Sequence, residues 1–405
     1  MTDPVDLSIV MPCLNEAETL ARCIEKARQG IQRSGVRGEI VIADNGSTDG
    51  SQAIAEKLGT RVVAVKEKGY GNALRGGVQA AAGRWILMGD ADDSYDFSEA
   101  DRFVKKFQDG FELVMGCRLA AGGGTIMPGA MPWKNHWIGN PALSFIGRLF
   151  FKCPARDFHC GLRGFTRAAF DRMELQTTGM EFASEMVIKA TLKGLRITEV
   201  PVTLHQDGRS RPPHLKPWRD GWRHLRFMLI YSPRWLFLVP GLALTALGTV
   251  FAGILSFHDI RIGEAVLDVG TLMAACMTVI VGFQLVAFAF FTKVFAMTHQ
   301  LLPADPKFTR LFRVFTLEKG VVVGLVILAA GLFLFSQAVW IWRQAGYGRL
   351  SYAENLRLLI PAATLLILGI QTVFSSFFMS VLGLSTGSHT PPPRAPDDSV
   401  SPGNP

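Results

Sequence analysis

The segment Met88-Gly-Asp-Ala-Asp-Asp-Ser-Tyr-Asp-Phe97 decides how this chain is interpreted, because an apolar run, Trp85–Met88, leads directly into it. Four carboxylates follow that run, at Asp90, Asp92, Asp93 and Asp96. Hard divalent cations prefer oxygen ligands and keep positions open for substrate phosphates. Asp90 and Asp92, two residues apart at the end of a strand, are therefore suited to hold Mg²⁺ or Mn²⁺ against a diphosphate. The alternative for the same residues is a solvated acidic turn, or an Asx-type cap on the following helix.

Short apolar runs alternate with helical stretches over the first half of the chain. The strand-like runs are Leu7–Met11, Glu39–Ala43, Val62–Val65, Trp85–Met88 and Glu112–Met115, and the helical stretches are 17–32, 48–58 and 72–82. Such alternation predicts an α/β domain built on a parallel sheet with helices on its faces. In these sheets, ligands bind beyond the carboxyl ends of the strands.

Polar clusters follow the first, second and fourth of these strands, where that rule places a ligand. They are Pro12-Cys13-Leu14-Asn15-Glu16, Asp44-Asn45-Gly46-Ser47-Thr48-Asp49 and the acidic turn. Glu16 and Asp44 are able to accept hydrogen bonds from a ribose or a base, with Asn15 as a further nucleotide contact, and Gly46 permits close approach of the backbone. The stretch 47–49 also suits a helix N-cap, which does not exclude a ligand.

A glycine-rich segment, Lys68-Gly69-Tyr70-Gly71-Asn72, precedes the third helical stretch. The backbone at Gly71 and Asn72 is expected to approach a phosphate or a ribose. A dinucleotide fingerprint would have a third glycine where Leu74 stands, so a dehydrogenase is disfavoured.

Four apolar blocks dominate the chain downstream of Tyr231, namely 235–257, 269–292, 320–342 and 358–384. None contains Asp, Glu, Lys or Arg, and each exceeds the roughly 18 to 20 residues that cross a bilayer core. The blocks predict four transmembrane helices.

Cations in the expected loops orient these spans. The segment before the first span holds Arg209, Arg211, Lys216, Arg219, Arg223, Arg226 and Arg234, and the loop between the second and third spans holds Lys293, Lys307, Arg310, Arg313 and Lys319. Because positive residues favour the cytoplasmic side, and no signal peptide is expected at Met1–Pro4, the catalytic half is expected in the cytoplasm. The net charge of +8 gathers beside the membrane and is no nucleic-acid signature.

The motifs Pro-Cys-Leu-Asn-Glu, Asp-Asn-Gly-Ser-Thr-Asp and Asp-Ala-Asp, at these spacings, resemble the inverting family-two glycosyltransferases with the GT-A fold. The resemblance covers roughly Leu7–Pro233 and is nearest to the polyprenyl-phosphate and dolichyl-phosphate hexose synthases. It implies a GT-A-type nucleotide-sugar domain with a mixed, mostly parallel sheet, followed here by an all-α membrane domain. By the family pattern, the nucleoside contacts are Pro12, Leu14, Glu16 and Asp44, and the residues that manage the metal and the diphosphate are Asp90 and Asp92. The family's Gln or Glu two residues past the second Asp is Ser94 here, which leaves the third protein ligand open.

Four arginines are candidates for phosphate contacts, namely Arg118, Arg163, Arg209 and Arg211. A lipid phosphate is largely ionised at pH 7, so such an acceptor needs cationic positioning and not a general base. The resemblance implies that Arg118 and the loop with Arg209 and Arg211 bind phosphates, and Arg163 is a further catalytic candidate. A structural or surface role is the alternative for each. Glu181 and Glu185, four residues apart on an expected helix, share one face of it. One of them could act as a base in a relative with a hydroxyl acceptor, or they could pair with arginines.

Two amphipathic stretches, 217–231 and 133–152, are expected at the membrane surface, although either could pack on the protein instead. The expected limits are 1–216 for a cytosolic GT-A domain, 217–231 for an interfacial helix, 232–385 for the membrane domain and 386–405 for a disordered tail.

Together these features predict a membrane-bound transferase that moves a hexose from a UDP- or GDP-linked donor to polyprenyl or dolichyl phosphate, with inversion and with Mg²⁺ or Mn²⁺. One alternative is a processive polysaccharide synthase, although the Gln of its Gln-x-x-Arg-Trp motif is missing before Ser232-Pro-Arg-Trp235. The other alternative is a lipid-linked sugar flippase. Helices that line a transport pathway usually carry charged residues, whereas the four apolar blocks here carry none. The sugar, the donor base, the lipid length and a homo-oligomeric state stay open.

Overall fold

The computed structural model describes residues 4–210, 217–299, 316–349 and 351–383, together with residues 302, 305, 306, 308 and 310. The chain forms two compact units, Met1–Trp235 and Leu236–Pro405. Arg211 and the predicted tail 386–405 lie outside the described residues.

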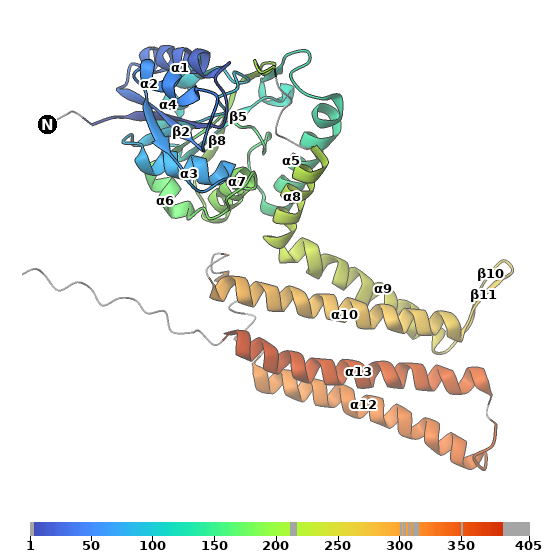
Figure 1. The fold of residues 1–405 in the computed structure, drawn as a ribbon. Helices are drawn as coiled ribbons and strands as arrows, with labels where there is room; N and C mark the ends of the chain where they lie inside the picture. The colour runs from blue at the N-terminus through green and yellow to red at the C-terminus, as the bar shows by residue number, and fades with distance from the viewer. Residues whose placement is uncertain are drawn as a thin grey trace, which may run out of the picture. The chain divides into compact units, whose positions relative to one another are not determined.

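The first unit is built on a seven-stranded sheet with the order β3-β2-β1-β4-β7-β5-β8 (Figure 1). Its strands are β1 (Leu7–Cys13), β2 (Gly38–Asp44), β3 (Arg61–Ala64), β4 (Trp85–Met88), β5 (Leu113–Cys117), β7 (Arg163–Thr166) and β8 (Ile197–Pro201). The pairs β1–β2, β1–β4, β2–β3 and β5–β8 are parallel. Strand β7 lies between β4 and β5 and is antiparallel to both. The predicted mixed, mostly parallel sheet is confirmed, but β7 and β8 were not among the predicted strands.

Helices cover both faces of this sheet, as Figure 1 shows. One face carries α1 (Leu20–Ser34), α2 (Ser51–Lys57) and α4 (Ala100–Gln108), and the other carries α3 (Tyr70–Ala80), α6 (Arg167–Met173) and α7 (Phe182–Leu192). Successive strand residues point to opposite faces, so Ile9 packs against the first set of helices and Val10 against the second.

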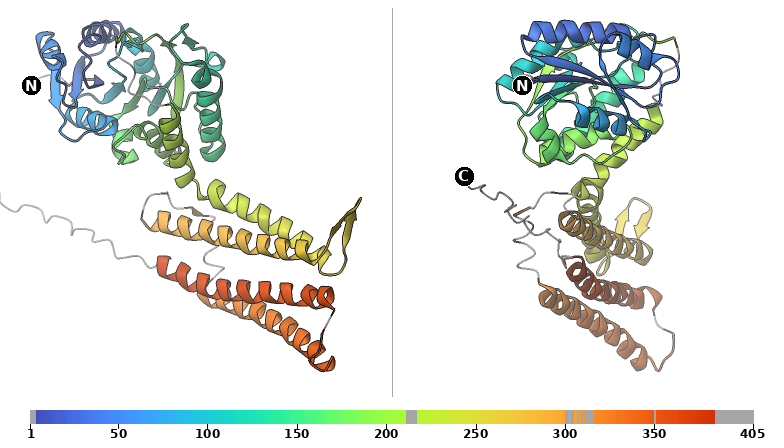
Figure 2. Two further views of the ribbon diagram at one scale, coloured as in Figure 1. Left: turned by 45° about the vertical axis from the view of Figure 1, so that its right-hand side comes forward. Right: turned by 60° about the vertical axis from the view of Figure 1, so that its left-hand side comes forward.

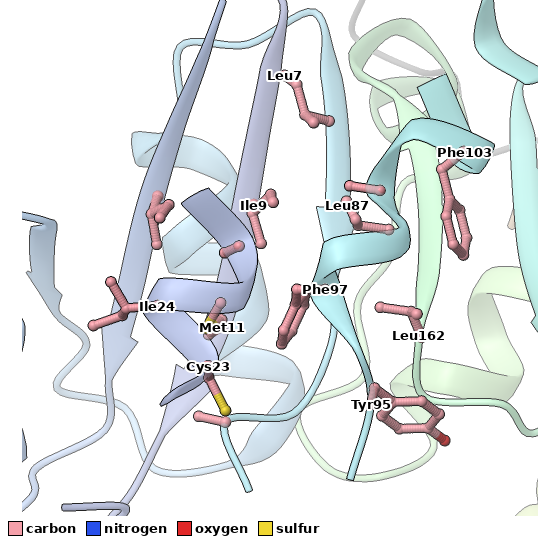
Figure 3. Packing of buried hydrophobic residues seen from close by; sticks show 14 of the residues in the cluster. Leu7, Ile9, Met11, Cys23, Ile24, Leu87, Tyr95, Phe97, Phe103 and Leu162 are labelled. Atoms are coloured by element: carbon pink, nitrogen blue, oxygen red, sulfur yellow. The ribbon is translucent and has the colours of Figure 1, made fainter. Parts of the chain in front are cut away.

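The apolar core on the α1 face of the sheet holds the acidic turn in place. Phe97, directly after the turn, is fully buried among Met11, Cys23 and Leu87 (Figure 3). Burying such a side chain stabilises the fold by roughly 1.5–3 kcal/mol. Tyr95 lies at the rim of the same cluster, and its hydroxyl points away from the apolar residues. The turn is therefore fixed by apolar anchors that follow its carboxylates.

Smaller elements complete the first unit. They are η1 (Phe97–Glu99), η2 (Ala120–Gly122), the parallel pair β6 (Thr125–Ile126) and β9 (Thr203–Leu204), the π-helical η3 (Asn135–Gly139), α5 (Asn140–Phe151) and α8 (Pro217–Ile230). Helix α8 packs against α5 and α7. Both stretches predicted to be amphipathic are thus mainly helical, and the compact unit extends beyond residue 216 to include α8.

The second unit consists of two helix pairs (Figure 2). Helix α9 (Val239–Leu255), which follows the π-helical η4 (Arg234–Leu238), packs on α10 (Val269–Thr298), and α12 (Leu317–Gln344) packs on α13 (Tyr352–Gly383). A hairpin of β10 (Ile260–Ile262) and β11 (Ala265–Leu267) joins the first pair. Among the described residues four helices are long and apolar enough to cross a membrane: 234–255, 269–298, 317–344 and 353–383.

Glycines allow close approach within each pair. A Cβ atom at Gly248 of α9 would lie 2.8 Å from the carbonyl oxygen of Ala275, and one at Gly331 of α12 would lie 2.8 Å from the backbone nitrogen of Leu366. Small residues let membrane helices pack tightly where the hydrophobic effect does not drive association. The glycines therefore explain why these helices pair as they do.

Candidate active site

The loops after β1 and β2 are joined into one structure by side-chain hydrogen bonds. Asn15, which has a positive φ of 60°, donates its backbone N–H to Ser47 Oγ at 2.9 Å, and its Oδ1 accepts the Thr48 N–H at 2.8 Å. The Glu16 N–H donates to Ser51 Oγ at 2.9 Å. Pro12 is half-buried in β1 and Leu14 is exposed beside these contacts. The structure thus brings the predicted nucleotide-contacting residues of both loops together at one sheet edge.

Asp44, the last residue of β2, is used to shape its own loop. Its carboxylate accepts hydrogen bonds from the Gly46 N–H at 2.9 Å and from Gln52 Nε2 at 2.6 Å. Burial alone would raise the pKa of Asp44, but these bonds and those from Ser47 outweigh it and hold the pKa below the usual value. Asp44 is therefore ionised and fixes the loop that approaches the predicted nucleoside.

Asp90 and Asp92 lie just beyond β4 at the same edge. The residue between them is tied to α1, because Thr19 Oγ1 donates to the Ala91 carbonyl at 2.7 Å. Burial, and then the charge of Asp92, raise the pKa of Asp90 to about 7, while the hydroxyl of Tyr70 hydrogen-bonds to its carboxylate. The charged form of Asp90 is thus disfavoured mainly by burial and then by the neighbouring Asp92 carboxylate.

The other two carboxylates of the turn have structural partners. Asp93, at a positive φ of 65°, pairs with Lys26 at 2.7 Å and Arg22 at 3.5 Å, both on α1. Asp96 accepts the Ser98 N–H at 2.9 Å and so caps η1. The alternative of a capping aspartate therefore holds for Asp96.

Arg209 brings a positive charge onto the turn from the segment after β9. Its Nη2 lies 2.8 Å from Asp92 Oδ2 and 2.9 Å from Asp207 Oδ2, and its Nη1 lies 3.2 Å from Glu16 Oε1. Asp92 Oδ1 accepts the Ser94 hydroxyl at 2.5 Å. The predicted acceptor-side arginine is thus in contact with the predicted donor-side carboxylates.

The donor set at this turn fits a hard divalent cation that a diphosphate helps to bind. Within the part of the chain that the structure describes, no three or more His, Cys, Asp or Glu side chains are grouped to hold a metal ion. Mg²⁺ commonly takes one or two protein carboxylates and fills its other positions with substrate phosphates and water. Asp90 and Asp92 provide two such carboxylates, and a nearby cation would favour the ionised form of Asp90, whose pKa burial raises.

The glycine-rich segment at 68–72 is packed against another loop. The N–H groups of Gly71 and Asn72 both donate to the Thr178 carbonyl, at 2.9 and 3.3 Å. A Cβ atom at Gly69, where φ is +133°, would lie 2.3 Å from the same oxygen. The backbone groups expected to approach a phosphate are therefore engaged by the protein itself.

Arg118 and Arg163 are both buried. Arg118 makes a two-pronged pair with Asp157, with Nε to Oδ2 at 2.7 Å and Nη2 to Oδ1 at 2.8 Å, and its Nη1 is 3.4 Å from the Tyr95 hydroxyl. Arg163, with no exposed surface, donates to the carbonyls of Cys160 and Ala183. These contacts match the structural alternative for Arg163, whereas Arg118 reaches the rim of the site through Tyr95.

Glu185 has a structural role within the second core. It is fully buried, pairs with Lys189 at 2.7 Å and accepts the Thr177 hydroxyl at 2.7 Å. Burial would raise the pKa of Glu185, but these hydrogen bonds hold it below the usual value. The partner of Glu185 is thus a lysine and not an arginine.

Sequence reasoning did not identify four residues of this region: Tyr70, Tyr95, Asp157 and Asp207. Tyr70 and Tyr95 lie inside the glycine-rich segment and the acidic turn, but the sequence pattern drew attention only to the glycines and aspartates there. Asp207 lies two residues before Arg209, a spacing that could have indicated their pairing. No local signal connected Asp157 to Arg118, because the partners are 39 residues apart.

Two family profiles and several known proteins match this chain. Residues 8–173 match the glycosyl transferase family 2 profile, and residues 290–383 match the profile of the glycosyltransferase family 2 C-terminal transmembrane region. A Haloferax volcanii protein named low-salt glycan biosynthesis hexosyltransferase Agl6 is 36% identical over 379 residues, which cover 93% of this chain and 89% of that protein. The chain belongs to glycosyltransferase family 2. This family-2 glycosyltransferase has a GT-A-type domain followed by membrane-spanning helices.

Two further matches cover the catalytic unit. The dolichyl-phosphate hexose transferase of Haloferax volcanii is 29% identical over 220 residues, which cover 53% of this chain and 89% of that protein. Among solved structures, the glucosyl-3-phosphoglycerate synthase of Mycobacterium tuberculosis, in complex with Mn²⁺, uridine diphosphate and glucosyl-3-phosphoglycerate, overlaps with a TM-score of 0.43 at 21% identity. That overlap covers 56% of this chain and 78% of the synthase.

Proposed function

We propose that this glycosyltransferase moves a hexose from a nucleoside-diphosphate donor to a polyprenyl phosphate, with inversion at the anomeric carbon. The observation that carries the proposal is the meeting of Asp92, Glu16 and Arg209 beyond the ends of β1 and β4. Acidic groups for a cation and an arginine for phosphates are thereby held at one sheet edge, where nucleotides bind in such folds.

The donor side is formed by the loops after β1, β2 and β4. The joined loops of residues 12–16 and 44–49 would hold the nucleoside, with Asp44 keeping its loop in shape. Asp90 and Asp92 would hold Mg²⁺ or Mn²⁺ against the diphosphate. When bound, such an ion stabilises the negative charge that develops on the leaving diphosphate.

The acceptor would act as its own nucleophile. A phosphate oxygen of the lipid forms a bond to the anomeric carbon while the bond from that carbon to the donor's diphosphate breaks, and the nucleoside diphosphate leaves. A phosphate monoester is largely ionised at pH 7, so no base is required. Glu185 is buried and paired with Lys189, so it is not placed to act as a base, which supports a mechanism without one. The protein must instead offset the repulsion between two phosphorylated substrates, and arginines suit that task.

The membrane unit supports a lipid acceptor. Gln371 Nε2 donates to Gln284 Oε1 at 3.0 Å, so these polar side chains of α10 and α13 are joined by a hydrogen bond within the bundle. The four spans thus suit anchoring and guiding a lipid. The relative named a dolichyl-phosphate hexose transferase supports the same acceptor class. We further propose that the catalytic unit faces the cytoplasm, as the loop cations indicate.

The test is to incubate purified protein with polyprenyl phosphate and a panel of radiolabelled UDP- and GDP-hexoses, and to examine the organic phase. The proposal expects one donor to yield a single-sugar glycolipid that mild acid cleaves. Label in a long polymer would indicate a processive synthase. Movement of a lipid-linked sugar across vesicles without any transfer would indicate a flippase. Either of these results would replace the proposal.

A further inference from the structure

The segment from Thr203 to Ser210 is fastened onto the acidic turn by its backbone. The His205 N–H donates to the Ser94 carbonyl and the Gly208 N–H donates to the Asp92 carbonyl, both at 2.9 Å. At the end of the segment, Ser210 donates its N–H at 2.7 Å and its hydroxyl at 2.5 Å to the carboxylate of Glu18. The segment that carries Arg209 is therefore docked on the very residue expected to bind a metal.

The position of this segment allows Arg209 to neutralise neighbouring acidic groups. Its side chain is only 11% exposed and contacts the carboxylates of Glu16, Asp92 and Asp207. Asp92 Oδ2 takes the guanidinium, and Asp92 Oδ1 takes the hydroxyl and N–H of Ser94. Both oxygens of Asp92 are thus in use within the protein alone.

We propose that Arg209 is a resident cation that must leave Asp92 before a divalent ion binds there, so that arrival of metal and donor diphosphate releases the 203–210 segment from the turn. The inference rests on the proposed function, because it takes Asp92 to be a metal ligand. Two cations repel strongly at carboxylate-bridging distance in a partly buried site. Metal and guanidinium therefore compete for Oδ2.

The released guanidinium has a better partner in the incoming donor. Arginine binds phosphate through paired N–H groups, and such charge-assisted hydrogen bonds are stronger than neutral ones. Exchange of a carboxylate for a diphosphate keeps the arginine paired throughout. The metal and the nucleotide would therefore assist each other's binding, and the metal alone would bind weakly.

The experiment measures Mn²⁺ binding to the full-length protein by the electron paramagnetic resonance signal of free Mn²⁺, first without nucleotide and then with uridine diphosphate. Arg209→Ala is expected to bind Mn²⁺ about tenfold more tightly than the wild type when nucleotide is absent. Uridine diphosphate should strengthen Mn²⁺ binding in the wild type more than in this variant. Arg102→Ala, which removes an exposed arginine paired with Glu99, is the matched control and should bind as the wild type does.

An unchanged or weakened affinity for Mn²⁺ in Arg209→Ala would overturn the inference. Asp92→Asn separates this failure from failure of the proposed function. If Asp92→Asn abolishes Mn²⁺ binding while Arg209→Ala leaves it unaltered, only the competition is wrong. If Asp92→Asn binds Mn²⁺ normally, the metal site itself is wrong.

Release of the segment has an independent readout in the unaltered protein. Trypsin cleaves after arginine, so cleavage between Arg209 and Ser210, followed by mass spectrometry, reports whether the arginine is held. We expect cleavage there to increase when Mn²⁺ is added alone at a saturating concentration, because Arg209 then leaves Asp92 with no diphosphate to bind. Unchanged or reduced cleavage would contradict release.

Discussion

Arg118 and Arg209 both bind aspartates, yet their surroundings differ in a way that separates structure from chemistry. Arg118 binds the carboxylate of Asp157 with two nitrogens, Nε and Nη2, in a buried pair. Arg209 shares one guanidinium among Asp92, Asp207 and Glu16, and Asp207 keeps a third of its surface exposed. We call the Arg118–Asp157 pair the closed site and the group around Arg209, which we propose receives a ligand, the open site.

The contrast teaches that an arginine's partners matter more than its presence in a motif. A buried pair with ideal geometry cannot release either member without leaving a charge uncompensated. An arginine spread over several carboxylates at a sheet edge can exchange one of them for a phosphate. We therefore propose that the Arg209 site exchanges a carboxylate for substrate, and that the Arg118–Asp157 pair supports the fold.

The largest expected effect is on turnover at the open site. Asp90→Asn and Asp92→Asn should each lower hexose transfer by on the order of 10²–10³-fold or more, because charge stabilisation at the leaving diphosphate is lost. The midpoint of thermal unfolding should stay near that of the wild type. Asp101→Asn, an exposed aspartate on α4, is the control and should transfer normally. Near-normal turnover in both site variants would remove the distinction between open and closed sites.

At the closed site the expected effect is on stability. Asp157→Ala leaves Arg118 buried without its partner, which should reduce the free energy of unfolding by about 3–5 kcal/mol. Chemical denaturation of the purified protein measures this change. Asp109→Ala, at an exposed pair with Lys106, should cost less than about 1 kcal/mol. A loss at Asp157 as small as that at Asp109 would show that the buried pair is dispensable.

A smaller effect is expected at Tyr95, which lies between the two sites. Its hydroxyl accepts the Gly161 N–H at 2.9 Å and contacts Arg118 Nη1 at 3.4 Å. Tyr95→Phe leaves these donors without that acceptor and should cost about 1–3 kcal/mol of stability. Tyr347→Phe, at an exposed tyrosine, is the control for denaturation and should have little effect. Equal stabilities would mean that the hydroxyl is not part of the closed site.

The smallest effect concerns pH. Burial, and then the charge of His224, lower the pKa of His159 well below its usual value, with Asp157, Arg163 and Arg118 as further charged neighbours. The folded protein thus binds this proton less readily than the unfolded chain does. Its contribution to stability is complete above about pH 6.5 and is lost as the pH falls below that value. His159→Gln should flatten the decline of the unfolding midpoint in that range, whereas His258→Gln, at an exposed histidine, should not. An unaltered slope in His159→Gln would refute this source of acid sensitivity.

Local patterns were sufficient to predict the membrane helices and the strand end at which Asp90 and Asp92 lie, whereas the role of these aspartates as metal ligands stays a prediction. An apolar strand that ends in Asp90 and Asp92 identifies a sheet edge by itself, and uninterrupted apolar blocks identify spans. The antiparallel strand β7 was missed because it is short and contains a fully buried arginine, which makes Arg163–Thr166 unlike a core strand. Arg163 is stable in this buried strand because it donates hydrogen bonds to the carbonyls of Cys160 and Ala183.

The remaining differences depend on contacts between distant parts of the chain. Gly69 and Gly71 suggested a phosphate loop, but the carbonyls of Thr177 and Thr178 account for both glycines. The partner of Arg118, Asp157, lies 39 residues further along the chain, and the role of Arg118 as a phosphate contact stays a prediction. Such partners become visible only when the chain is folded.

The dependence of transfer on a divalent cation tests the central claim most directly. Purified enzyme treated with EDTA and assayed with labelled donor and polyprenyl phosphate should form no glycolipid, and adding Mg²⁺ or Mn²⁺ should restore transfer. The same addition should restore nothing in Asp92→Asn. Full transfer in EDTA would contradict the assignment of Asp90 and Asp92 as the carboxylates that hold a cation against the donor's diphosphate.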